Sequence, residues 1–76
     1  MIEDYRPGDT IQLLLRGTHA AAVMTEWWET NRESDLRWRR AKTKGCAVLE
    51  TTDLMFAARI VQWYEGVKVN IKHREP

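Results

Sequence analysis

A chain of 76 residues has room for one domain with one hydrophobic core. Its apolar share of 43% and charged share of 30% are those of an ordinary globular protein, which excludes a disordered chain. The net charge of +1 argues against a strongly basic nucleic-acid binder and against an acidic mimic of DNA. We therefore expect a single domain over 1–76, with 1–8 as an N-terminal arm and 73–76 as a short C-terminal end.

Cysteine content and hydropathy give an expectation for the compartment. Cys46 is the single cysteine, so neither an intramolecular disulfide nor a zinc site built from several cysteines can form. No apolar run approaches the roughly 20 residues that span a bilayer, and 1–7 lack the features of a signal peptide. We expect a soluble cytoplasmic protein with no membrane partner.

The first half predicts a strand followed by a helix. Residues 11–16 alternate between apolar and polar side chains, with Leu14 as an apolar residue on the side expected to face solvent. Thr18 is a candidate N-cap for a helix over 19–32. Trp27 and Trp28 are adjacent, hence about 100° apart on a helix. One of the two is expected at the rim of the core.

Residues 35–51 predict a hairpin that is the most charged part of the chain. Five of the eight residues over 37–44 are basic. Leu36 and Trp38 are expected to point inward from the first strand, because the alternative phase would bury Arg37 and Arg39. A turn at 44–45 leads to a strand over 46–51, whose continuous apolar run predicts a central strand covered on both sides.

The second half repeats the pattern of the first. Residues 51–53 offer N-cap candidates for a helix over 54–65, and Gly66 is suited to its C-terminal end. Residues 67–72 alternate as a second half-buried strand.

This order of elements predicts an α+β, ferredoxin-like βαββαβ domain. Its four-stranded antiparallel sheet would have the strand order 4-1-3-2, with both helices on one face. The two most apolar strands, 11–16 and 46–51, would then be central. The alternative is an α+β dimer in which strands from two chains complete one sheet.

Catalytic and metal-binding motifs are missing from the sequence. Cys46 falls in a predicted central strand, and His19 and His73 fall at element ends, so we expect no nucleophile–base pair. The histidine and cysteine spacings match no metal-ligand template. We expect no enzyme activity, no cofactor and no metal.

Basic residues support a nucleic-acid-binding hypothesis as the alternative function. Side chains that face away from the helices would form a basic surface suited to phosphate contact. However, RNA-recognition domains of this topology stack bases on aromatic residues of the central strands, and 11–16 and 46–51 contain none. The residues expected to bind nucleic acid are Arg16, Arg37, Arg39, Lys68 and Lys72.

Protein binding is the function that we favour from the sequence. Trp and Arg are the residues most often found as interface hot spots, and small chains without a catalytic motif include phage and mobile-element inhibitors of host proteins, such as defence nucleases. A homodimer is a further alternative, since the acidic helix end and the basic hairpin could meet across a two-fold axis. The residues expected to contact a protein partner are Arg37, Arg39, Arg40, Lys42, Lys44 and Trp28.

Overall fold

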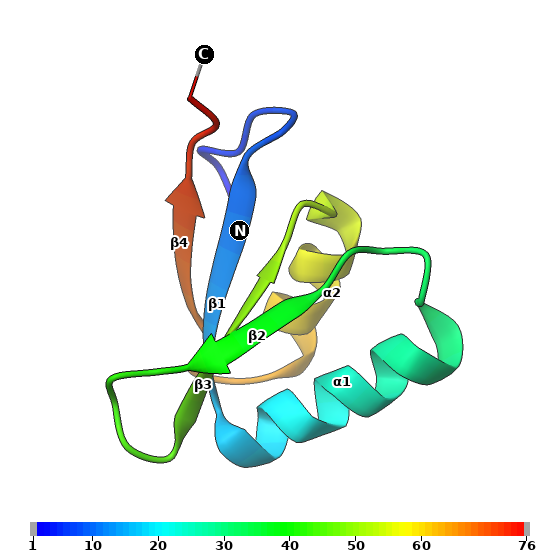
Figure 1. Ribbon diagram of the computed structural model, residues 1–76, viewed down its shortest axis with the longest axis vertical. Helices are drawn as coiled ribbons and strands as arrows, with labels where there is room; N and C mark the ends of the chain where they lie inside the picture. The colour runs from blue at the N-terminus through cyan, green and yellow to red at the C-terminus, as the bar shows by residue number, and fades with distance from the viewer. Residues whose placement is uncertain (1, 76) are drawn as a thin grey trace.

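The computed structural model describes residues 2–75 (Figure 1). The predicted sequence of strand, helix and strand occurs twice, as expected. The outermost residues of the predicted arm and C-terminal end, 1 and 76, lie outside the described part. The elements in chain order are β1 (Thr10–Arg16), α1 (Gly17–Thr30), β2 (Arg37–Arg40), β3 (Cys46–Thr51), α2 (Leu54–Trp63) and β4 (Lys68–Lys72).

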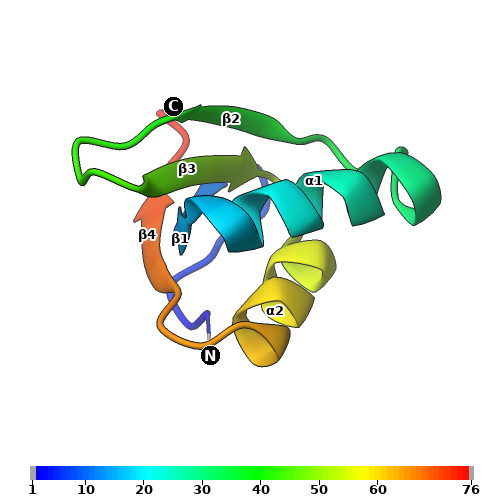
Figure 2. The same ribbon diagram turned by 90° about the horizontal axis from the view of Figure 1, so that it is seen from below.

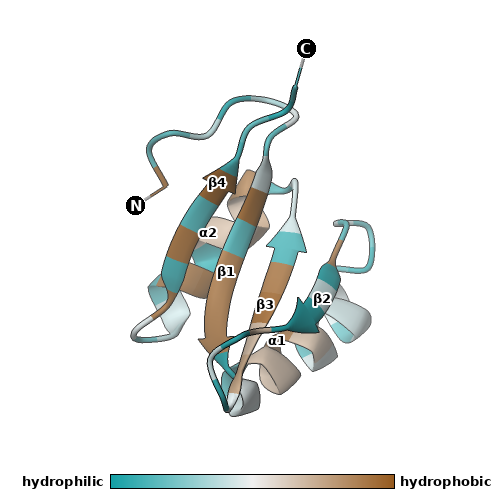
Figure 3. Ribbon diagram, turned by 60° about the vertical axis from the view of Figure 1, so that its left-hand side comes forward, coloured by the Kyte–Doolittle hydropathy of each residue, from teal (hydrophilic) through white to brown (hydrophobic). Residues whose placement is uncertain are grey.

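The sheet has the predicted composition and strand order. Its four strands, all from one chain, are antiparallel in the order β2-β3-β1-β4, which is 4-1-3-2 read from the other edge. Both helices pack against β1 and β3 on the same face, and the opposite face is open (Figure 2, Figure 3). The result is an α+β fold that is consistent with a ferredoxin-like arrangement.

The core lies between the two central strands and the helices. Ile11, Leu13 and Leu49 have no exposed surface, and every second residue of β1 points into this layer. Each large aliphatic side chain buried there contributes roughly 1.5–3 kcal/mol of transfer free energy. The helices contribute Ala20, Val23, Phe56, Ala57 and Ile60.

Two local predictions were wrong. The strand over 46–51 is central but is covered by helices on one face only, so Cys46 and Val48, which lie on the open face, stay half-buried. Helix α1 begins at Gly17, directly after β1, with Arg16 in the N-cap position and no side-chain cap. The Gly17 N–H instead donates to the Gly45 carbonyl oxygen at 2.8 Å, which fixes the helix start against the hairpin turn.

Two carboxylates fix the loop between α1 and β2. Asp35 accepts hydrogen bonds from the backbone N–H and the hydroxyl of Thr52, just beyond the end of β3. Asp53 caps α2 by accepting from the Phe56 N–H at 3.0 Å and also accepts from the Ser34 hydroxyl. The bond from Ser34, followed by that from Phe56, lowers the pKa of Asp53. The entry to β2 is therefore attached to the end of β3.

A third carboxylate joins the two ends of the described chain. Asp9 is 3% exposed and accepts hydrogen bonds from the Arg74 N–H at 2.9 Å and the Arg6 N–H at 3.0 Å. Its other contact is the His73 Nδ1 at 2.7 Å. The Arg74 backbone N–H is the main cause of a lowered pKa for Asp9, which burial partly opposes.

Replacing Asp9 tests this junction through its pH dependence. Because the folded pKa lies below the unfolded value of about 3.9, the contribution of Asp9 is fully present above that value and is lost as the pH falls through the folded pKa. We expect Asp9→Asn to lower the urea midpoint at neutral pH, and the gap from wild type to close in acid. Glu29→Gln is the control, because Glu29 is exposed. A gap that does not change with pH would contradict the assignment.

A matched pair of truncations tests the one-sided core. We expect Leu49→Ala to lower the free energy of unfolding by about 2–5 kcal/mol, because it empties a fully buried site. Leu14→Ala, on the open face of the neighbouring strand, should cost about 1 kcal/mol or less. Urea unfolding monitored by circular dichroism measures both. Equal losses would show that the open face is covered in solution.

Candidate functional site

The open face of the sheet carries the charged side chains that the sequence predicted for it. Successive residues of a strand point to opposite faces, and Ile11, Leu13 and Leu49 fix which side faces the helices. Strand pairing then brings together, on the open face, Gln12, Leu14 and Arg16 of β1, Arg37 and Arg39 of β2, Val48 and Glu50 of β3, and Lys68, Asn70 and Lys72 of β4.

A polar row crosses this face from one edge to the other. The Asn70 Nδ2 donates to the Gln12 Oε1 at 2.7 Å, and the Gln12 Nε2 donates to the Glu50 Oε2 at 2.8 Å. The Arg39 Nε lies 3.8 Å from the Glu50 Oε1, so β2 is joined to the row by a looser ion pair. The row holds four side chains in place, one from each strand.

The sequence prediction missed the role of Glu50 on this face. Five cations, on Arg16, Arg37, Arg39, Lys68 and Lys72, share the face with this one carboxylate, which leaves a surplus of four positive charges. Glu50 lies directly opposite Gln12, and its position in the alternation of 46–51 already places it on the face away from Leu49. The sequence analysis did not assign Glu50 to the open face, because it treated the strand over 46–51 as covered on both sides.

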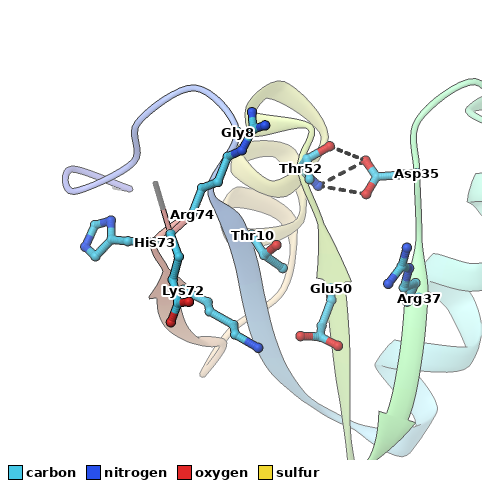
Figure 4. Close-up of a pocket in the computed structure, with 10 residues that line it drawn as sticks. Gly8, Thr10, Asp35, Arg37, Glu50, Thr52, Lys72, His73 and Arg74 are labelled. Carbon is cyan, nitrogen blue, oxygen red and sulfur yellow. Dashed lines mark hydrogen bonds between the residues drawn. The ribbon is translucent and has the colours of Figure 1, made fainter.

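A hollow of about 600 Å³ lies where the open face meets the chain ends (Figure 4). Arg37, Lys72 and Arg74 line it together with three carboxylates, so its charge is mixed. One of these carboxylates, Asp35, already accepts from Thr52 (Figure 4). The hollow suits water and small polar groups, since none of the described residues that line it has a large apolar side chain.

The histidines and the cysteine are engaged separately. The His19 ring packs on Tyr64 with centroids 5.0 Å apart, and His73 contacts Asp9. Within residues 2–75 no hydrogen bond joins Cys46 to either imidazole, and no group of three His, Cys, Asp or Glu side chains is placed to hold a metal ion. Over the same residues, no helix is both long enough and apolar enough to cross a bilayer.

Strand β2 is the most exposed strand of the sheet. Its residues Arg37, Trp38, Arg39 and Arg40 are all exposed. Trp38 pairs with Leu49 and therefore lies on the helix side, as its alternation phase predicted, but 59% of it is exposed. Trp38 thus points to the expected side without being buried there, because the helices lie over β1 and β3 and leave the β2 edge without cover. Arg40 lies on the same side as Trp38, whereas Arg37 and Arg39 face the open side.

The two adjacent tryptophans of α1 have different environments. Trp27 packs against the core, and its Nε1–H donates to the Ser34 carbonyl oxygen at 2.6 Å. Trp28 is 61% exposed, with the Arg32 guanidinium 5.2 Å from its ring centroid. Trp28 is thus the residue at the rim.

Helix geometry places Trp28 on the flank of α1 that faces β2. His19 contacts Tyr64 and so marks the flank that faces α2. Trp28 follows His19 by nine residues, which at about 100° per residue puts it on the opposite side. In Figure 2, α1 lies between α2 and β2, so this opposite side borders the β2 edge. We call the apolar residues of this flank and of the helix side of β2 and its entry, Met24, Trp28, Leu36 and Trp38, the α1–β2 margin.

The structure brings most of the predicted protein-contact residues to one edge. Arg37, Arg39 and Arg40 are in β2, Lys42 and Lys44 are exposed in the following turn, and Trp28 borders the same edge. The residues predicted for nucleic acid divide between the edges instead, with Lys68 and Lys72 in β4 at the far side. The two hypotheses therefore differ in which cations they require.

Comparisons with protein families, with curated proteins and with solved structures find no match to this chain.

Substituting each α1 tryptophan tests their different environments. We expect Trp27→Phe to lower the free energy of unfolding by about 1 kcal/mol or more, because the Ser34 carbonyl loses its donor. Trp28→Phe should change it by no more than about 0.5 kcal/mol, as for other exposed positions. Urea unfolding measures the stabilities, and acrylamide quenching should fall on removal of Trp28 only. The reverse order of effects would contradict the assignment.

Proposed function

We propose that this protein is a non-enzymatic protein-binding module of ferredoxin-like architecture that contacts its partner through β2 and the turn that follows. The observation that carries the proposal is that all four residues of β2 are exposed, including a tryptophan on the side of the sheet where the helices pack. The proposed contact residues are Arg37, Arg39, Arg40, Lys42, Lys44 and Trp28.

The charges at this edge support the proposal. Within residues 2–75, Arg39 is the one cation of β2 and its turn that has an ion-pair partner, and its distance to Glu50 is 3.8 Å. Cations that lack a carboxylate neighbour can pair with a partner without losing an existing bond. Exposed Trp and Arg side chains, as found here, are the residues with the largest effects in alanine scans of interfaces.

The molecule has enough surface for one interface of standard size. A stable interface buries about 800 Å² on each partner, and the whole described chain exposes 5898 Å². An inhibitor that acts by covering its partner's surface needs one such contact, which β2 and the turn after it would supply.

A second candidate function is supported by a different observation, the surplus of four positive charges on the open face. Arg16, Lys68 and Lys72 would contact phosphates there together with Arg37 and Arg39. None of the strand residues described on the open face is aromatic, so no base could stack there, and binding would depend on charge and weaken steeply with salt.

Two matched charge reversals distinguish the candidates. Arg40→Glu with Lys42→Glu alters only the proposed protein contact, and Lys68→Glu with Lys72→Glu alters only the open face; each pair changes the net charge equally. We call the first variant the β2 pair and the second the β4 pair. We expect the β2 pair to lose any partner that the wild type captures from nuclease-treated host lysate, whereas the β4 pair should still capture that partner. Trp28→Ala should weaken capture by tenfold or more, about 1.4 kcal/mol.

The opposite result supports the second candidate. If the β4 pair abolishes a gel shift of single-stranded RNA or DNA while the β2 pair largely retains it, the open face binds nucleic acid. A partner captured equally by the wild type and by both pairs would contradict the proposed surface.

A further inference from the structure

Resting on the proposed function, we infer that the partner contributes an extended segment that pairs with β2 as a fifth strand, with acidic and apolar residues in alternation. β2 has a free backbone edge, different side chains on its two faces and a poor match to a second copy of itself.

The free edge of β2 has backbone groups available. In an antiparallel ladder each residue of an edge strand directs its N–H and C=O either to its neighbour or outward, in alternation. β3 occupies one side of β2, and within residues 2–75 no loop or side chain forms a hydrogen bond with the backbone of 37–40 on the other. Such an edge is a template for an added strand.

The other edge of the sheet is less accessible. Ile2, Glu3 and Asp4 line a shallow depression together with Val69 and Ile71, so the N-terminal segment lies beside β4. Of the two edges, β2 is the one without a neighbouring segment.

The two faces of β2 select different side chains. Arg37 and Arg39 lie on the open face, so a paired strand would place carboxylates opposite them. Trp38, a member of the α1–β2 margin, lies on the helix side, where an apolar side chain opposite it would bury the exposed ring. A single strand meets both requirements when acidic and apolar residues alternate with a period of two.

Pairing of β2 with a second copy is disfavoured by charge. In a two-fold antiparallel pair, residues directly opposite each other point to the same face. If the two-fold axis passes Trp38, Arg37 of each copy lies opposite Arg39 of the other, which gives two like-charged pairs. If the axis passes one of the arginines of β2, that arginine lies opposite its own copy. Like charges directly opposite destabilise a pair, so an acidic strand fits better than β2 itself.

Designed peptides test the inference on the whole chain. The probe is Ac-Glu-Val-Glu-Leu-Glu-Val-Glu-amide. One control replaces the central Leu by Pro, which keeps the charge but removes a backbone donor; the other has the same composition with all Glu residues first. We expect the alternating peptide to slow hydrogen exchange of β2 amides and to shift the tryptophan emission to shorter wavelength, a shift that Trp38→Phe should remove. Each control should bind at least tenfold more weakly.

Four results are distinguishable. Protection of β2 by the alternating peptide alone supports the inference. If all three peptides bind equally and lose binding at high salt, the contact depends on charge alone. That result overturns strand addition but is compatible with the proposed protein-binding function. If β2 amides are protected from hydrogen exchange in the absence of peptide, and this protection rises with protein concentration, the edge pairs with a second copy and the inference is overturned. No binding at low salt overturns the inference, and the lysate experiment with the charge-reversal pairs still decides the proposed function.

Discussion

The pairing of β1 with β3 is the constraint on which the rest of the structure depends. These two strands carry Leu13 and Leu49, which face each other in register and have no exposed surface. Both helices cover this pair because that is where the apolar surface is continuous. β2 and β4 are consequently edge strands, and β2, with four residues, lies beyond the helices. The exposure of Trp38 follows from this placement.

Two chemically different surfaces result from one alternating pattern. The open face has a surplus of positive charge and a hydrogen-bonded row through Gln12 and Glu50. The β2 edge adds aromatic area to positive charge, with Trp38 and Trp28 both more than half exposed. Arg37 and Arg39 belong to both surfaces. A partner that binds β2 would therefore also reduce the charge available on the open face.

The alternation of side chains was sufficient to predict the element order, the central strands and the face on which Trp38 lies. Whether Trp38 is covered was not predictable in this way, because cover depends on where the axis of α1 crosses the sheet. The sequence also did not decide which of Trp27 and Trp28 is exposed. The hydrogen bond that holds Trp27 inward, from its ring to the Ser34 carbonyl oxygen, depends on the conformation of the loop after α1.

Contacts between distant parts of the chain were the main features that the sequence did not reveal. Asp9 and His73 are brought together only when β1 and β4 pair, and nothing local to either residue indicates the contact. The helix start at Gly17 likewise depends on the hairpin carbonyl of Gly45, so the local N-cap signal of Thr18 was misleading. The basic hairpin was evident from the sequence as a candidate site, whereas the α1–β2 margin was not.

The central claim is that β2 is an open edge with free backbone donors, and amide hydrogen exchange of the unbound protein tests it most directly. Two alternating residues of 37–40 should exchange slowly, because they bond β3, and the other two should exchange at rates close to those of exposed loops. Slow exchange of all four amides in dilute protein would show that the edge is already paired, and would contradict the account.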